Sequence, residues 1–248
     1  MWIMSSSRTD KAINTLIMCG MVVSIVIATV LKIQDGGAGS TVKLIVTGLG
    51  AVFGIISTVL AANGNILTFL FGILDMSIYT AVLIDNAMWA QTALRVLYSF
   101  PMQIIGFLSW KKRNATAKKP VAAERLKPRG WLLTVALFVL MFVVCAFVSH
   151  FIGKGVGEAE PLLKTCLDAV ITSANIVAMV LMSQAYLEQW YLWIVLNVSS
   201  MAIWLLNINT NPDGGYTIVI FLKYLFYLLN CINAIRIWLR LSSSKNQN

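Results

Sequence analysis

The feature that most constrains this chain is a series of long apolar segments separated by short polar breaks. An α-helix rises about 1.5 Å per residue, so about 20 residues cross the roughly 30 Å hydrocarbon core of a bilayer. Segments of about this length run over residues 12–33, 42–62, 66–84, 87–110, 131–152, 161–184, 189–207 and 216–239. The sequence therefore predicts an all-α integral membrane protein with about eight transmembrane helices.

The composition indicates a membrane protein and argues against several kinds of site, including zinc sites and ATP-binding loops. The chain is 58% hydrophobic and only 12% charged, with a mean hydropathy of +0.79, which is too apolar for a soluble domain of this length. The cysteines form no CxxC pair and the one histidine stands apart from them, so neither a zinc site nor a disulfide framework is indicated. No GxxxxGK[ST] motif is present, so the chain does not itself couple ATP. We expect no metal and no cofactor.

Charge predicts the orientation of the spans. The loop at 111–129 carries Lys111, Lys112, Arg113, Lys118, Lys119, Arg125, Lys127 and Arg129. The positive-inside rule places this loop in the cytoplasm, and alternation then places both termini there too. Basic runs also occur in nucleic-acid-binding proteins, but between two spans a solvated loop at the lipid surface explains the net charge of +9 better. We expect a multi-pass protein of the cytoplasmic (inner) membrane, in contact with the lipid bilayer and with no nucleic acid.

The chain also resembles itself on either side of this basic loop. TFLFGILDMS (68–77) can be compared with WYLWIVLNVS (190–199), which puts Asp75 at the position of Asn197. GFLSWKKR (106–113) resembles AIRIWLRL (234–241), with a small residue four positions before a Trp in both. Matches in the same order indicate an internal repeat.

The repeat predicts a 3+1+3 arrangement. Two parallel three-helix repeats are joined by one connector helix, and one extra helix precedes them, because an odd connector makes both repeats start on the same side. The expected divisions are an N-terminal transmembrane helix at 1–41, a first repeat at 42–110, a cytoplasmic basic loop and connector helix at 111–160, a second repeat at 161–240 and a cytoplasmic tail at 241–248. Parallel repeats of this kind occur in carriers that bind a substrate near the midplane.

Polar and aromatic residues inside the spans are the candidates for a substrate site. Trp190, Trp193 and Asn197 are spaced i, i+3, i+7, so they share one stripe of a helix. An indole face binds a flat cation and an amide binds hydroxyl or carboxamide groups. The alternatives are that Trp190 is an interfacial anchor and that Asn197 links helices.

Two other spans carry candidates of the same kind. Thr172 and Asn175 lie near the middle of one predicted helix, and Asp75 lies near the middle of another. A lone acid in a span costs about 2.5–3.5 kcal/mol on insertion scales, so Asp75 is expected to serve as a counter-charge or as a proton site. Pro101 frees a backbone carbonyl and predicts a bend beside a cavity.

Several stretches resemble one known family. YSFPMQIIGFLSW (98–110), LDAVITSANIVAMVLM (167–182), EQWYLWIVLN (188–197) and YLLN (227–230) are similar to sequences of the PnuC family of nicotinamide riboside transporters. The resemblance covers roughly residues 42–240 and rests on the PMQxxGxxxW and EQWxxWxxxN patterns. Where the family commonly has an aromatic residue and Gly near the end of the last span, Asn233 and Ala234 stand here.

The resemblance implies a function, an assembly and further site residues. It implies a SWEET-like bundle, often a homotrimer, that imports nicotinamide riboside by facilitated diffusion, with a cytosolic kinase trapping the substrate by phosphorylation. It places Gln103 in the substrate site and adds Tyr98, Tyr227 and Asn230 as candidates. Because the family includes carriers of thiamine and riboflavin, another flat vitamin is an alternative substrate.

Two other classes of function fit the sequence less well than transport does. An intramembrane enzyme needs a catalytic constellation, which one histidine and a few isolated acids do not supply. A receptor that binds the ligand without moving it would need a signalling domain, and the loop of about 20 residues at 111–129 is too short to fold as one. The sequence therefore predicts a carrier and no enzyme.

Overall fold

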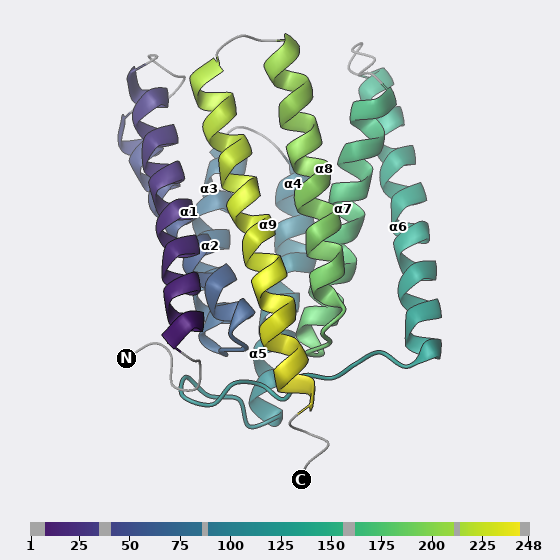
Figure 1. The fold of residues 1–248 in the computed structure, drawn as a ribbon. Helices are drawn as coiled ribbons and strands as arrows, with labels where there is room; N and C mark the ends of the chain where they lie inside the picture. Colours follow the sequence, from purple (N-terminus) through teal and green to yellow (C-terminus); the bar gives the residue numbers. More distant parts are fainter. Residues whose placement is uncertain (1–7, 35–40, 86–88, 156–161, 211–213, 244–248) are drawn as a thin grey trace.

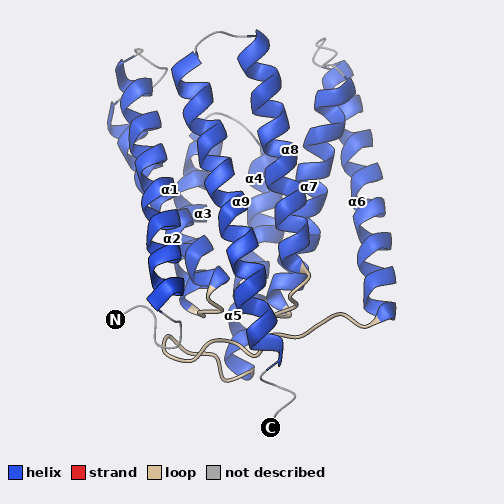
Figure 2. Ribbon diagram, viewed as in Figure 1, coloured by secondary structure: helices blue, strands red, loops and turns tan. Residues whose placement is uncertain are grey.

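The computed structural model describes residues 8–34, 41–85, 89–155, 162–210 and 214–243, and these parts are almost entirely helical (Figures 1 and 2). The elements are α1 (Arg8–Gln34), α2 (Thr41–Ala62), α3 (Leu67–Asp85), α4 (Trp89–Leu94), η1 (Arg95–Ser99), α5 (Phe100–Lys112), α6 (Pro128–Gly155), α7 (Leu162–Ser183), α8 (Gln189–Thr210) and α9 (Gly214–Ser243). The predicted all-α membrane fold is confirmed.

Within the described residues, seven helices are long and apolar enough to cross a membrane. The remaining predicted span, 87–110, is divided into α4, the π-helical turn η1 and α5, with residues 86–88 outside the described part. Pro101 stands in the first turn of α5, where its missing N–H costs least. A π-helical turn stands just before the proline where the sequence predicted a bend, and such turns often mark functional positions.

Six of the spans form a closed ring. Packing runs from α2 to α3, α5, α7, α8 and α9, and α9 returns to α2. We call α2, α3 and the α4–η1–α5 span the first half, and α7, α8 and α9 the second half. Outside the ring, α1 packs on α2 and α9, while α6 packs on α7 and stands at the edge of the bundle (Figure 1).

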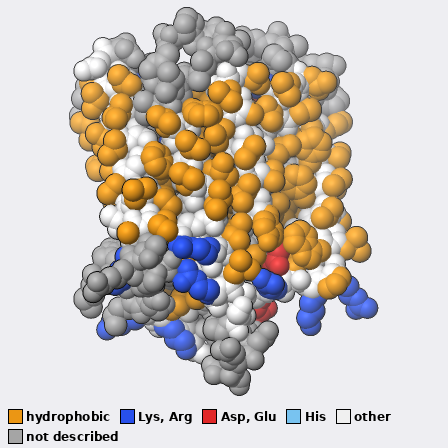
Figure 3. All heavy atoms as spheres, viewed as in Figure 1, with side chains coloured by type: hydrophobic (Ala, Val, Ile, Leu, Met, Phe, Trp, Pro, Cys, Tyr) orange, Lys and Arg blue, Asp and Glu red, His pale blue; other side chains and the backbone are white. Residues whose placement is uncertain are grey.

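Hydrophobic side chains cover the outer surface between the two ends of the bundle, and Lys and Arg side chains gather near one end in the view of Figure 3. That end holds the end of α5, the start of α6, the end of α9 and the 113–127 loop, and we call it the basic end (Figure 1). The outward side chains of α6 are apolar, such as Leu132 at 72% exposed and Leu133 at 70%. Lipid is the solvent that such a surface requires.

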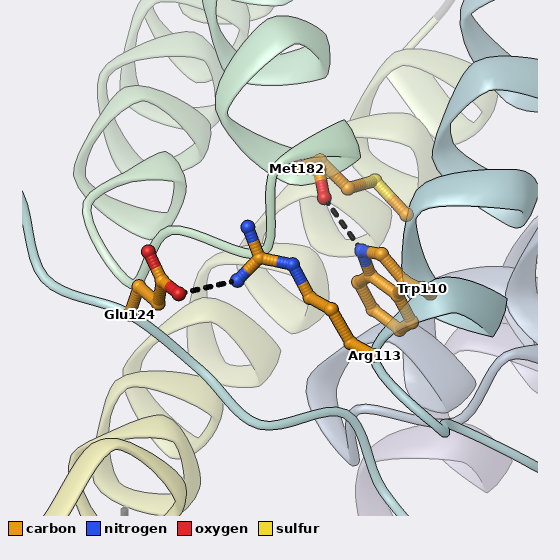
Figure 4. Close-up of polar contacts among 4 residues, drawn as sticks. All are labelled: Trp110, Arg113, Glu124 and Met182. Carbon is orange, nitrogen blue, oxygen red and sulfur yellow. Dashed lines mark hydrogen bonds and ion pairs between the residues drawn. The ribbon is translucent and has the colours of Figure 1, made fainter.

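The two halves make equivalent bonds at the basic end. Trp110 of α5 donates its indole N–H to the carbonyl of Met182 on α7 over 2.8 Å, and Trp238 of α9 donates to the carbonyl of Ala61 on α2 over 3.1 Å (Figure 4 shows the first). Both bonds join one half to the other, and each half supplies one indole donor and one carbonyl acceptor. This equivalence is what the predicted repeat would produce, although the 3+1+3 division stays a prediction.

The turns that follow α2 and α7 are also equivalent. Gly64 has φ +65° and Ala185 has φ +56°, and each donates its backbone N–H to the carbonyl three residues earlier over 2.9 Å. The basic loop binds both turns, because Val121 donates to the carbonyl of Gly64 and Glu124 donates to the carbonyl of Ala185, each over 2.9 Å. Glu124 also pairs with Arg113 at 2.9 Å (Figure 4). The loop therefore braces the two halves at the basic end.

Aromatic packing relates the two halves in a register that differs from the predicted repeat by one residue. Phe69 packs on Trp110 with ring centroids 4.9 Å apart, and Trp190 packs on Trp238 with ring centroids 6.0 Å apart. With Trp110 and Trp238 as counterparts, this packing pairs Phe69 with Trp190 and therefore Met76 with Asn197. The backbone bonds at the starts of α3 and α8 fit both registers, so the alignment of Asp75 with Asn197 stays a prediction.

Candidate functional site

A cavity of about 560 Å³ lies inside the ring of six spans. Its walls come from both halves, with residues from α2, α3, the α4–η1–α5 span, α7, α8 and α9. The volume is in the range of small-molecule sites, which also tend to combine apolar walls with a few placed polar groups.

The structure brings nearly all the predicted site residues to this one cavity. Those that line it are Asp75, Tyr98, Gln103, Thr172, Asn175, Trp190, Trp193, Asn197 and Tyr227. Asn230 is the exception, since it is fully buried and donates from its amide to the carbonyl of Thr58 on α2 over 3.3 Å. It joins α9 to α2 instead of lining the cavity. For the others, a role in substrate binding stays a prediction.

Four aromatic side chains pack in one buried cluster on the basic side of the cavity: Phe69, Trp110, Trp190 and Trp238. Of these, Trp190 lines the cavity. Ring centroids are 4.9 Å apart for Phe69 and Trp110, 5.8 Å for Trp110 and Trp238, and 6.0 Å for Trp190 and Trp238. Tilted and edge-to-face contacts at these distances are favourable. Trp190 is only 2% exposed, so it is not an interfacial anchor facing lipid head groups.

Asn197 is fixed by two contacts of its amide nitrogen. This nitrogen donates to the carbonyl of Trp193 over 2.8 Å and to the sulfur of Cys231 over 3.5 Å. An amide has two N–H groups, so both are used, and the carbonyl oxygen is the atom left to face the cavity that Asn197 lines. Within the described part of the chain, Asn197 therefore offers an acceptor.

Gln103 lies directly against the backbone of α3. A Cβ atom at Gly72 would come within 3.0 Å of the Gln103 amide nitrogen and 3.1 Å of its oxygen, so a side chain at this position would require the amide to shift by a few tenths of an ångström. Its oxygen is buried and accepts no hydrogen bond from the described residues. A buried unpaired polar group of this kind calls for an explanation, and a bound ligand is one.

Asp75 is placed in a similar way against α2. A Cβ atom at Gly54 would lie 3.1 Å from the carboxyl carbon of Asp75. Arg95 and Lys223 both interact electrostatically with the Asp75 carboxylate. Each of these cations also lies over a tyrosine ring, and the Arg95 guanidinium is 4.2 Å from the centre of the Tyr79 ring. Among the described residues of the cavity lining Asp75 is the one acid, and Arg95 provides a positive charge in the same lining.

The remaining predicted residues have structural contacts as well as a place in the lining. Tyr98, in the π-helical turn, donates its hydroxyl to the carbonyl of Ile176 on α7 over 2.6 Å, which ties the two halves together. Tyr227 packs on Tyr224 with ring centroids 6.3 Å apart. Thr172 and Asn175 reach the cavity from the same face of α7.

Sequence reasoning missed several polar residues of the lining. Arg95, which was not among the predicted site residues, lines the same cavity as Asp75. Ser57 and Thr68 also line it and bond to one another across α2 and α3, with the Ser57 hydroxyl donating to the Thr68 carbonyl over 2.8 Å. Single Ser and Thr residues are common in membrane helices, so their spacing alone carried no signal.

Comparison with known proteins gives consistent matches over most of the chain. Residues 44–240 match the family described as "Nicotinamide mononucleotide transporter". The nicotinamide riboside transporter PnuC of Neisseria mucosa is 32% identical over 198 residues, which are 78% of this chain and 71% of that protein. The protein of the same name from Haemophilus influenzae is 29% identical over 205 residues, or 80% of each chain.

A solved structure agrees with these matches. The crystal structure of the vitamin B3 transporter PnuC superposes with a TM-score of 0.66 and 27% identity, covering 96% of this chain and 99% of that one. The family match covers well over half of the chain, and the structural match extends it to nearly the whole fold. The chain therefore belongs to the nicotinamide mononucleotide transporter family, which its sequence predicted through the resemblance to PnuC.

Proposed function

We propose that this protein imports nicotinamide riboside across the cytoplasmic membrane by facilitated diffusion. The observation that carries the proposal is the cavity between the two halves, which gathers nine residues named from the sequence alone. Relatives that bear the name nicotinamide riboside transporter cover most of this chain. Their family is one of transporters, which supports transport and no enzymatic role for this chain.

The cavity fits the chemistry of such a substrate. Nicotinamide riboside has a flat cationic ring, a carboxamide and a polyol. The indole faces of Trp193 and Trp190 suit the ring, with a cation–π contribution of about 0.5–2 kcal/mol, and Asp75 supplies a counter-charge. Asn197 and Gln103 suit the polar groups of the ligand.

Transport requires the cavity to open alternately to each side, and we propose that the two halves rock about it. We place the basic end in the cytoplasm, with both termini, because the positive-inside rule assigns the loop at 111–129 to that side. Phosphorylation of the imported nucleoside by a cytosolic kinase then makes uptake unidirectional. We also propose a homotrimer, as the family resemblance implies.

The test is uptake of labelled nicotinamide riboside into proteoliposomes by the wild type and by Trp193→Ala and Asn197→Ala. We expect both variants to lose affinity by tenfold or more, because each removes a group that lines the cavity. Tyr191→Phe is the matched control on the same helix, since Tyr191 is 42% exposed on the outer surface. Unchanged affinity in both cavity variants would contradict the site.

The same preparation separates the alternatives. Excess unlabelled thiamine or riboflavin should leave nicotinamide riboside uptake unchanged, and strong competition by either would favour that vitamin as the substrate. Counterflow of labelled substrate distinguishes a carrier from a receptor, because a receptor binds the ligand without exchanging it across the membrane.

A further inference from the structure

Three exposed basic residues stand where the basic loop enters α6. They are Arg125, Lys127 and Arg129, and we call them the strap bases. The stretch before α6 is extended, so Arg125 and Lys127 project from one side of its backbone, about 6.6 Å apart. Figure 3 shows Lys and Arg side chains just below the apolar surface on the side where α6 begins in Figure 1.

The backbone that carries the strap bases is fixed on the turn between α7 and α8. Glu124 donates its N–H to the carbonyl of Ala185 over 2.9 Å, and Leu187 donates its N–H to the carbonyl of Glu124 over 2.9 Å. Leu126 donates its N–H to the Glu188 carboxylate over 3.0 Å. The strap bases are therefore presented at one place on the bundle.

The acids around the strap bases have other partners. Glu124 is the one acid in the sequence between residues 111 and 129, and its carboxylate pairs with Arg113 at 2.9 Å. Glu188 is only 6% exposed, and its carboxylate accepts the Leu126 N–H. The positive charge of the strap bases is thus directed to a partner outside the chain.

The surface changes from basic to apolar directly beside the strap bases. Trp131 stacks on Tyr191 with ring centroids 6.1 Å apart, and both rings are partly exposed. Leu132 and Leu133 follow on the outer surface, and Leu133 is about 6 Å of helix rise from Arg129. Trp and Tyr side chains favour the level of the lipid head groups, so the strap bases stand at this level too.

We propose that the strap bases, together with the Trp131–Tyr191 pair, bind the head group of an anionic phospholipid whose acyl chains lie along α6. Lys and Arg side chains near a bilayer surface attract anionic lipids, and a guanidinium suits a phosphate because it donates two parallel hydrogen bonds. A soluble acidic partner would meet the bases but leave the exposed leucines of α6 uncovered. A lipid fits the whole surface, whichever substrate the cavity takes.

The test is thermal unfolding of the purified full chain in neutral detergent with added dioleoyl phosphatidylglycerol or with the same amount of dioleoyl phosphatidylcholine. We expect the anionic lipid to raise the midpoint by about 5 °C more than the zwitterionic lipid, because a ligand of the folded state stabilises it. The triple variant Arg125→Gln, Lys127→Gln, Arg129→Gln should lose at least half of this difference. Each variant is its own reference, so lower stability of a variant does not affect the comparison.

The matched control is the triple variant Lys112→Gln, Lys118→Gln, Lys119→Gln, which removes the same charge from exposed positions elsewhere in the basic loop. It should keep the full difference between the two lipids. Equal losses in both triple variants would indicate general attraction to the basic end and overturn the site. An unchanged difference in the first variant would overturn it as well, and so would an equal rise with inorganic phosphate or a short RNA, since neither has acyl chains.

Discussion

The two indole bonds at the basic end make a specific prediction about how the cavity opens. Trp110 and Trp238 each donate an N–H from one half to a backbone carbonyl of the other. If the halves separate here when the cavity opens toward the basic end, these bonds exist in the closed state and are lost in the open one. Trp110→Phe and Trp238→Phe remove the donors while keeping an aromatic ring, so each should shift the equilibrium toward the open state.

The size of the shift follows from the remaining contacts. The carbonyl of Ala61 also accepts from the Gly64 N–H, and the carbonyl of Met182 also accepts from the Ala185 N–H, each over 2.9 Å. Neither carbonyl is left unpaired by the substitution, so each lost bond is worth about 1 kcal/mol. At about 1.36 kcal/mol per factor of ten, the open population rises about fivefold in each single variant and about 30-fold in the double variant.

Thiol labelling measures this population. Cys231 lines the cavity, and in a variant that retains it as the one cysteine its modification by a hydrophilic reagent reports opening. The reagent is added from the basic side, and Trp131→Phe on α6 serves as the control because Trp131 is 41% exposed outside the ring. Labelling of the double variant at the wild-type rate would refute the reasoning. Equal acceleration from both sides would indicate general loosening and refute it as well.

Three further predictions follow from single positions. Ala185→Gly should raise the free energy of unfolding by about 1 kcal/mol and Gly64→Ala should lower it by at least as much, as measured by thermal unfolding in detergent, because both residues have positive φ. Gly72→Ala should weaken nicotinamide riboside binding by tenfold or more in a calorimetric titration, because the new Cβ displaces the Gln103 amide; unchanged binding would show that this amide is not used. Glu124→Gln removes one side of an ion pair that is 24% and 31% exposed, and should cost only about 0.5 kcal/mol, with a difference from the wild type that disappears at high salt.

Hydropathy and charge allowed most of the fold to be predicted. Long apolar runs have few ways to satisfy their backbone in lipid, so the positions of the spans follow from composition alone. The division of the fourth span did not follow, because a π-helical turn leaves no distinct pattern in an apolar sequence. Pro101 indicated the part of the span where the helix is irregular, but not that the irregularity is a π-helical turn. That turn ends two residues before the proline, at Ser99.

The candidate site could be predicted as far as helical spacing reaches. The stripe of Trp190, Trp193 and Asn197 follows from 3.6 residues per turn, and all three line the cavity. The exclusion of Asn230 could not be predicted, because its direction depends on where α2 packs. Hydrogen-bond assignments such as the one that fixes Asn197 depend on contacts between helices that are distant in sequence, such as α8 and α9.

The register given by aromatic packing relates two similar halves to an asymmetric site. In that register Gly72 of the first half and Trp193 of the second are counterparts, each three residues after Phe69 and Trp190. In the first half the small Gly72 makes room for the large amide of Gln103. In the second half the large Trp193 accompanies the small Cys231, which is Gln103's counterpart seven residues before Trp238. This exchange of large and small residues keeps the helix packing of the two halves alike, while one wall of the cavity carries an indole and the other an amide. An asymmetric ligand requires such a difference, whereas the equivalent indole bonds at the basic end require none.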